Sequence, residues 1–271
     1  MRRGHFFLAF GLLVLGALGS PVSSIHAGPA PSSKKPLTQV PLKKAQVMAE
    51  WAHDPSLFTQ GFFFEAQDLY ESAGLYGRSR VIKYRLGEQV TAEWRPGEKY
   101  FAEGAVLAGE TIYVLTWREG VVFCLDPRDL TLKETRFLPQ ESWGLTFDGE
   151  KLWRSDGSDR LWPHSLSLAS IGGPINVRAG NKPIKYLNEL EYDPQSGLIL
   201  ANILGDPRVA FIDPQTGQVK FFLDCQALVQ KYAPKITEAV LNGLALDAEG
   251  RLHLTGKLWP KILRVDWPDS R

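Results

Sequence analysis

The residues best able to do chemistry lie beside a glycine at the start of short apolar, strand-like runs. Glu103 precedes Gly104 in one such stretch, and it is the only carboxylate at this position. A single carboxylate among uncharged neighbours suits proton transfer, because a general acid or base is one titratable group set among groups that hold the substrate. The equivalent positions in four similar stretches carry amide or indole side chains: Gln60, Trp143, Asn188 and Asn242.

Further polar and aromatic residues accompany these positions. Glu189 stands where the other copies have glycine. Trp117 and Lys257 occupy equivalent positions near the end of the second strand of their repeats. With Phe58 and Phe101, these side chains would form a pocket with one acid/base group, one cation, several amides and aromatic walls. Each also has an ordinary structural interpretation, because strand-end charges are commonly solvated and repeated aromatic residues commonly pack between strands. The residues alone therefore predict a pocket without naming a reaction.

The elements that would position this pocket are short strands in a fivefold repeat. Strand starts recur at intervals of roughly 40 to 55 residues, close to the period of four-stranded propeller blades. They begin at Leu69, Ile112, Leu152, Leu198 and Leu252, most of them after a turn. We predict an all-β fold, a five-bladed β-propeller over residues 45–271, in preference to a β-sandwich.

Two segments are expected to complete this fold. The run Val47–Trp51 precedes the first blade and should supply the outer strand of the last blade. A helix is expected over residues 227–232 in the connection between the fourth and fifth blades. An extension toward Ala239, interrupted by Pro234, is the alternative. Cys124 and Cys225 lie in strand-like runs of different repeats, and they are either paired or two separate buried thiols.

The N-terminal segment has the features of a targeting sequence. Arg2 and Arg3 precede an apolar run over residues 6–18, which is typical of a secretory signal peptide. The run is shorter than the ~20 residues of a membrane-spanning helix. We assign residues 1–27 to the signal peptide and 28–44 to a linker, with cleavage after Gly19 or Ala27 and a retained anchor as the alternatives. We expect a periplasmic or secreted protein without stable membrane contact after cleavage.

The charge balance argues against some partners. The 271 residues carry 31 Lys and Arg against 30 Asp and Glu, a formal net charge of +1. Such a balance favours neither nucleic acid nor an anionic membrane. The 5 His and 2 Cys are scattered without zinc-ligand spacing, so no transition-metal site is expected.

Taken together, the motifs resemble those of a known family, the plant and bacterial glutaminyl-peptide cyclotransferases of the five-bladed propeller type. The matching stretches occur in the family's order: Phe58–Gly61, Glu71–Gly77, Phe101–Gly104, Leu115–Trp117, Trp143–Thr146, Ser155–Ser158, Leu187–Glu191, Leu241–Gly243 and Thr255–Pro260. The resemblance implies cyclisation of the N-terminal glutamine of peptides or proteins to pyroglutamate, with release of ammonia.

The resemblance also implies roles for individual residues. Glu103 would be the proton shuttle, with Lys257 and Asn188 as further catalytic residues, and Lys257 or an amide donor would hold the oxyanion. The residues expected to bind substrate are Gln60, Phe58, Phe101, Trp117, Trp143, Glu189 and Asn242. The implied scheme needs no metal or other cofactor, and a structural calcium ion in the propeller channel stays an alternative. We expect a monomer.

Two departures from the family pattern stand out. Leu204 follows Ala201–Ile203 where the family commonly has Trp, and Ala102 stands where glycine is usual. We expect activity to survive, with a shifted preference for the second residue of the substrate. Two other functions stay open: a non-catalytic propeller that binds peptides or a partner protein, and a calcium-dependent lactonase-type hydrolase, which usually needs several carboxylates around one metal.

Overall fold

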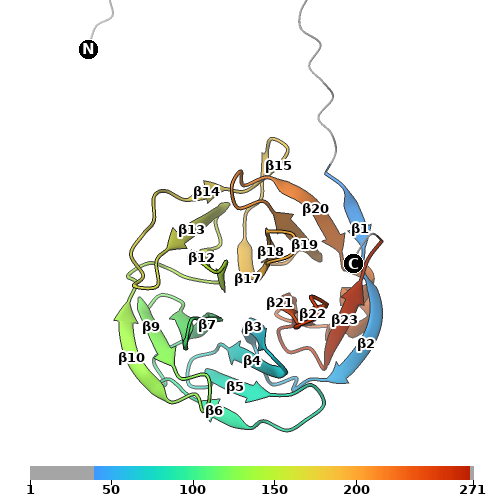
Figure 1. Ribbon diagram of the computed structural model, residues 1–271. Helices are drawn as coiled ribbons and strands as arrows, with labels where there is room; N and C mark the ends of the chain where they lie inside the picture. Colours follow the sequence, from blue (N-terminus) through green and yellow to red (C-terminus); the bar gives the residue numbers. More distant parts are fainter. Residues whose placement is uncertain (1–39, 269–271) are drawn as a thin grey trace, which may run out of the picture. The chain divides into compact units, whose positions relative to one another are not determined.

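Five sheets form a ring in the computed structural model, which describes residues 40–268 (Figure 1). This arrangement confirms the predicted five-bladed β-propeller. Each blade begins with an inner strand beside the ring axis and continues outward strand by strand. The inner strands of neighbouring blades contact one another around the whole ring. The predicted signal peptide and residues 28–39 of the predicted linker lie outside the described residues.

The first three blades follow the chain in order. Blade one contains β3 (Thr59–Glu65), β4 (Asp68–Ala73), β5 (Arg80–Tyr84) and β6 (Ala92–Trp94). Blade two contains β7 (Ala102–Ala108), β8 (Thr111–Thr116), β9 (Val121–Leu125) and β10 (Leu132–Phe137). Blade three contains β11 (Leu145–Phe147), β12 (Leu152–Arg154), β13 (Arg160–His164) and β14 (Ile175–Asn176).

The last two blades are preceded by a small hairpin of β15 (Arg178–Ala179) and β16 (Lys182–Pro183). Blade four contains β17 (Leu187–Asp193), β18 (Leu198–Ile203), β19 (Arg208–Ile212) and β20 (Val219–Asp224). Blade five contains β21 (Leu241–Leu246), β22 (Leu252–Gly256) and β23 (Lys261–Asp266).

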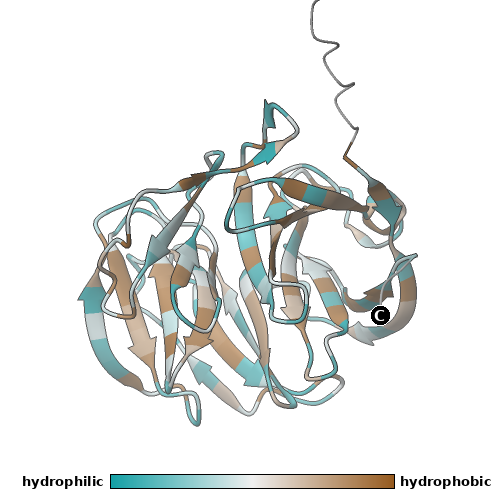
Figure 2. Ribbon diagram, turned by 45° about the horizontal axis from the view of Figure 1, so that its top comes forward, coloured by the Kyte–Doolittle hydropathy of each residue, from teal (hydrophilic) through white to brown (hydrophobic). Residues whose placement is uncertain are grey.

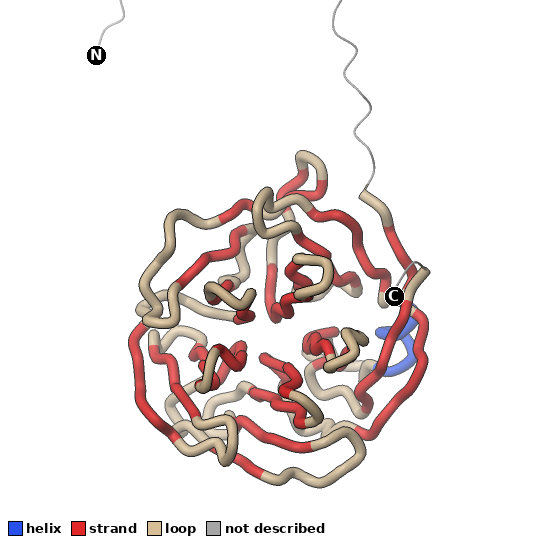
Figure 3. The backbone as a smooth tube through the Cα atoms, in the orientation of Figure 1, coloured by secondary structure: helices blue, strands red, loops and turns tan. Residues whose placement is uncertain are grey.

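The predicted helix is present as α1 (Gln226–Tyr232), at the outer side of the ring in the connection between blades four and five (Figure 3). It ends where expected, because Ala233 precedes Pro234 and adopts an extended conformation. No helix among residues 40–268 has the length and apolar character that crossing a membrane requires.

The N-terminal residues close the ring. Strand β2 (Gln46–Ala52) pairs antiparallel with β23, so the segment around Val47–Trp51 supplies the outer strand of blade five as predicted. Strand β1 (Leu42–Lys44) pairs parallel with β20 and adds a fifth strand to blade four. The predicted linker therefore ends before residue 44. Leu42–Lys44 form a strand because the outer strand β20 exposes unpaired backbone groups, and β1 pairs with them.

The apolar core is divided among the blade interfaces. Five clusters of buried side chains each combine residues of two neighbouring blades. The middle strands β8 and β9 are almost fully buried because both faces of the sheet are covered, whereas the outer strand β10 is mostly exposed. Figure 2 shows the same contrast between a largely hydrophilic outermost strand and the hydrophobic strands beside it. Cys124 and Cys225 are free, buried thiols in different clusters.

Candidate active site

The strand ends predicted to converge do so at one end of the ring. Gln60, Glu103 and Asn188 lie on the inner strands β3, β7 and β17, and Trp143 lies just before β11. Together with residues that flank other strands they line a cavity of about 190 Å³, whose wall is made of Gln60, Phe101, Glu103, Trp117, Trp143, Asn188, Leu204 and Lys257.

Hydrogen bonds between blades fix the backbone around this cavity. The Ser72 hydroxyl donates to the Glu103 carbonyl oxygen at 2.5 Å, and the Ser155 hydroxyl donates to the Asn188 carbonyl oxygen at 2.6 Å. The Gly104 amide donates to the Trp143 carbonyl oxygen at 2.6 Å. Each bond joins a strand entry to the next blade, so the side chains at these entries are held by the ring itself rather than by flexible loops.

The Glu103 carboxyl group is buried beside a single cation. Glu103 is 4% exposed, and no group among residues 40–268 donates a hydrogen bond to its carboxylate. Burial raises the pKa of Glu103 well above its usual range, since desolvation disfavours the charged form. The positive charge of Lys257 opposes this rise in the pKa, and the negative charges of Glu119 and Glu141 add to it. Glu103 is thus a strongly perturbed titratable group in a cavity, which is typical of an acid/base residue.

The Lys257 amine is buried as deeply as its neighbour. The residue is 5% exposed, and burial lowers its pKa to about 8, although the nearby Glu103 favours the charged form. The nitrogen Nζ lies 4.7 Å from the centroid of the Phe58 ring, within cation–π range. Phe58 itself is not part of the cavity wall; it supports the lysine from behind and meets Phe101 edge-on at 6.3 Å.

Aromatic rings form the other side of the cavity, and two glycines make room for them. The rings of Phe101 and Trp117 lie 5.7 Å apart. A Cβ atom on Gly74 would lie 2.2 Å from the Phe101 ring, and one on Gly157 would lie 2.6 Å from the Trp143 ring. Both distances are far below van der Waals contact, so only glycine lets these rings sit against the strand ends.

Like Phe58, two further predicted substrate-binding residues lie outside the cavity wall. Asn242 is fully buried and donates through Nδ2 to the Thr59 carbonyl oxygen at 2.8 Å and to Gln60 Oε1 at 3.4 Å. Glu189 accepts a 2.9 Å hydrogen bond from the Leu244 amide and ties β17 to β21. Glu189 does not line the cavity, although the neighbouring Asn188 does. Asn242 supports Gln60, and Glu189 joins two inner strands.

Glu141 is a residue of this site that sequence reasoning missed. Its oxygen Oε1 accepts hydrogen bonds from the indole nitrogens of both Trp117 and Trp143, at 2.9 and 3.0 Å. The position of Glu141, two residues before Trp143 in the sequence, was only a weak indication that it belongs to the site. Its contact with Trp117 joins two loops of different blades, and no periodic pattern reports such a contact.

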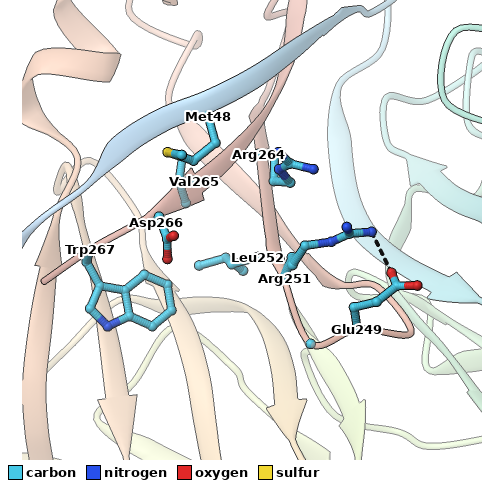
Figure 4. A pocket seen from close by; sticks show the side chains of 9 residues that line it. Met48, Glu249, Arg251, Leu252, Arg264, Val265, Asp266 and Trp267 are labelled. Carbon is cyan, nitrogen blue, oxygen red and sulfur yellow. Dashed lines mark hydrogen bonds and ion pairs between the residues drawn. The ribbon is translucent and has the colours of Figure 1, made fainter. Parts of the chain in front are cut away.

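A second cavity, of about 210 Å³, lies at the opposite end of blade five (Figure 4). Its wall includes Met48, Leu252 and Trp267 and the hydrogen-bonded pair Arg251 and Glu249. Strand β21 leads from the Glu103 end of the ring to the turn that carries Glu249, so this cavity is remote from Glu103. None of the predicted site residues lines it. Among residues 40–268, no three His, Cys, Asp or Glu side chains are grouped so as to hold a metal ion.

Comparison with known proteins identifies the family to which this site belongs. The family model described as "Glutamine cyclotransferase" matches residues 21–267. The chain belongs to the glutamine cyclotransferase family. Within it, the chain is 34% identical over 235 residues to the glutaminyl-peptide cyclotransferase of Arabidopsis thaliana, covering 83% of this chain and 71% of that protein. It is also similar to the crystal structure of Myxococcus xanthus glutaminyl cyclase, with a TM-score of 0.77, 35% identity, and coverage of 83% of this chain and 97% of that one.

Proposed function

We propose that this protein is a glutaminyl-peptide cyclotransferase, which converts the N-terminal glutamine of a peptide to pyroglutamate, and that the chemistry takes place in the cavity at Glu103. Family membership supports the activity. The observation that carries the assignment to this cavity is the buried Glu103 carboxyl group beside a buried lysine amine and an aromatic wall.

The reaction is a transfer within one residue. The free α-amine attacks the carbon of the side-chain carboxamide, and a new C–N bond closes the five-membered ring. The bond from that carbon to the amide nitrogen then breaks, and ammonia leaves. The attacking amine loses one proton and the departing nitrogen gains one, so the reaction needs a group that moves a proton between two nitrogens.

Glu103 is the group proposed to move this proton. As a carboxylate it takes the proton from the amine during attack, and as a carboxylic acid it delivers that proton to the leaving nitrogen. A carboxyl group of ordinary pKa would be a weak base at neutral pH, whereas burial raises the pKa of Glu103 toward the working range. The absence of a hydrogen bond to its carboxylate among residues 40–268 leaves both oxygens available to substrate.

Lys257 is proposed to stabilise the oxyanion of the tetrahedral intermediate. Among residues 40–268 it is the one cation that lines the cavity, and its pKa of about 8 leaves it mostly charged at neutral pH. The amide groups of Gln60 and Asn188 can donate further hydrogen bonds from the inner strands. Such donors, fixed before the reaction begins, stabilise charge that develops only in the transition state.

The size of the cavity fits one residue rather than a peptide segment. At about 190 Å³ it is smaller than the roughly 300–1,000 Å³ of sites for drug-sized ligands. We therefore propose that the glutamine enters bent between Phe101, Trp117 and Trp143, with its amine and carboxamide held together and water excluded. The second substrate residue would lie at the rim beside Leu204, which is 37% exposed.

The test is ammonia release from a glutamine-initiated dipeptide amide by the purified mature chain, with and without a chelator. The matched substrate control is the same peptide with an acetylated amine, which cannot cyclise. We expect chelator-insensitive release by wild type and nearly complete loss in Glu103→Gln. Wild type that binds the peptide without releasing ammonia would instead be a peptide-binding propeller. Loss of release with the chelator would contradict the metal-independent scheme and favour a calcium-dependent one.

We also propose that the mature protein acts as a monomer outside the cytoplasm. Arg2, Arg3 and the apolar run over residues 6–18 support export. Cell fractionation with N-terminal sequencing of the exported protein would test this, and would decide between cleavage after Gly19, cleavage after Ala27 and a retained anchor. Light scattering of the purified protein would test the monomer.

A further inference from the structure

Glu141 contacts both tryptophans of the cavity wall through one atom. The indole nitrogens of Trp117 and Trp143 lie 2.9 and 3.0 Å from the same oxygen, Oε1. Trp117 follows β8 of blade two, and Trp143 precedes β11 of blade three. One carboxylate oxygen therefore fastens together aromatic rings from two blades at the edge of the reaction cavity.

The Glu141 side chain is itself held on several sides. The Arg118 guanidinium lies 4.0 Å from the Trp117 ring centroid, and its Nε lies 3.4 Å from Glu141 Oε2. The Glu141 carbonyl oxygen accepts a 2.5 Å hydrogen bond from Arg154, which is buried. Carboxylate, guanidinium and indole thus form a cluster at the protein surface, where the side chains of Glu141 and Arg118 are 40% and 61% exposed. The loop that carries Glu141 is fixed to β12 by the bond from Arg154.

The Glu141 carboxylate stays ionised in this cluster. Burial raises its pKa, but hydrogen bonds from Trp143 and Trp117 and the charge of Arg118 outweigh burial and leave the pKa below its usual range. Its negative charge in turn disfavours ionisation of Glu103. The charge of Glu119 acts in the same direction, and the positive charge of Lys257 acts in the opposite direction. On its other side Glu141 lines a separate cavity with further titratable groups: Arg154, Asp156, Arg160 and His164.

We propose that Glu141 is a positioning residue for cyclisation, whose single oxygen holds Trp117 and Trp143 against the bound glutamine while its charge acts on Glu103. The proposal rests on the cyclotransferase function. Its two parts are separable, because hydrogen bonding needs only an oxygen acceptor, whereas the electrostatic effect needs a charge. Glutamine at this position would keep the oxygen and lose the charge; alanine would lose both.

The test compares Glu141→Gln and Glu141→Ala with wild type in the ammonia-release assay. We expect E141A to lose about 100-fold in kcat/KM, because the two rings that orient the substrate are released. We expect E141Q to lose less than about tenfold, because an uncharged oxygen still accepts both indole hydrogens. We also measure kcat as a function of pH. In E141Q the acid limb of this profile should move to lower pH, since removal of the neighbouring charge lets Glu103 ionise more readily.

Glu119→Gln is the matched control. Glu119 also disfavours ionisation of Glu103, but its carboxylate accepts a hydrogen bond from the Tyr76 hydroxyl rather than from a cavity tryptophan. E119Q should move the acid limb in the same direction as E141Q without the loss of kcat/KM expected of E141A. Thermal unfolding of each variant checks that it is folded.

Three outcomes would overturn the proposal. An E141A enzyme with wild-type kcat/KM would show that the tryptophans need no anchor. An E141Q enzyme as inactive as a folded E141A enzyme would show that holding and charge are not the separate roles proposed. An E141Q enzyme with an unmoved acid limb would show the same, and this result does not depend on E141A being folded. All three are distinct from failure of the cyclotransferase function, in which wild type itself releases no ammonia.

Discussion

Replacement of Lys257 by methionine tests the electrostatic part of the mechanism most directly. Methionine has a similar unbranched shape but no charge, so the cavity keeps its wall while it loses its one cation. Gln60 and Asn188 remain able to donate hydrogen bonds, which limits the damage. Loss of one preorganised oxyanion donor typically costs about 10²–10³ in kcat, and we expect Lys257→Met to fall in this range.

The same variant should move the pH profile in a defined direction. The charge of Lys257 is the one interaction that holds down the pKa of Glu103, so its removal raises that pKa further. The carboxylate needed for attack then forms only at higher pH, and the acid limb of kcat moves upward. In wild type the alkaline limb should lie near pH 8, where Lys257 loses its proton. Lys257→Arg should lack that limb, because arginine stays charged across this range.

The assay is ammonia release measured from pH 5 to 10 on wild type, Lys257→Met and Lys257→Arg with one dipeptide amide. Ionisation of the substrate amine is common to all three, so differences between the profiles belong to the enzyme. A Lys257→Arg enzyme whose activity still falls near pH 8 would refute the assignment of that limb. A Lys257→Met enzyme with wild-type kcat would refute the oxyanion role.

Three further predictions follow from buried groups. Glu103→Gln should raise the thermal unfolding midpoint at pH 7 while activity is lost. The pKa of the Glu103 carboxyl is raised by folding, so at any pH above its unfolded-state pKa the need to ionise this group destabilises the folded state, and glutamine removes that cost. An unchanged or lower midpoint in calorimetry would contradict this. Gly157→Ala should lower that midpoint and raise KM, since Gly157 has φ +76° and its new Cβ would overlap the Trp143 ring; wild-type values of both would be inconsistent with the packing described. Burial lowers the pKa of His53, but its contacts with Glu71 outweigh burial, so the pKa is raised. The contribution of His53 to the free energy of unfolding should therefore be full below pH 6.5 and be lost as pH rises through the folded-state pKa. His53→Gln should remove this pH dependence of the unfolding free energy, measured by urea unfolding between pH 6 and 9.

The repeat in the sequence was sufficient to predict the fold and the main members of the cavity. Strand entries of one ring must face a common axis, so Gln60, Glu103 and Asn188 could be placed together without coordinates. Lys257 and Trp117 followed from the same reasoning applied to the ends of the second strands.

What could not be predicted was which way individual side chains turn and which loops meet. Asn242 occupies an equivalent strand entry, yet its amide is used by the Thr59 carbonyl oxygen, and this choice depends on local packing rather than on register. Glu141 lies in a connection outside the repeat, and its contact with Trp117 depends on the path of two loops. Leu42–Lys44 are too short and too polar to be recognised as a strand until the open edge of β20 is in view.

The closure of the ring by β2 and β23 has a consequence for the time course of folding. Gln46 pairs with Asp266, so a strand near the beginning of the propeller must wait for the last strand before blade five is complete. Contacts between residues so distant in sequence form slowly. During synthesis, β2 has no partner strand until nearly the whole chain has emerged. The ring therefore closes only when the last strand of the chain, β23, is available to pair with β2.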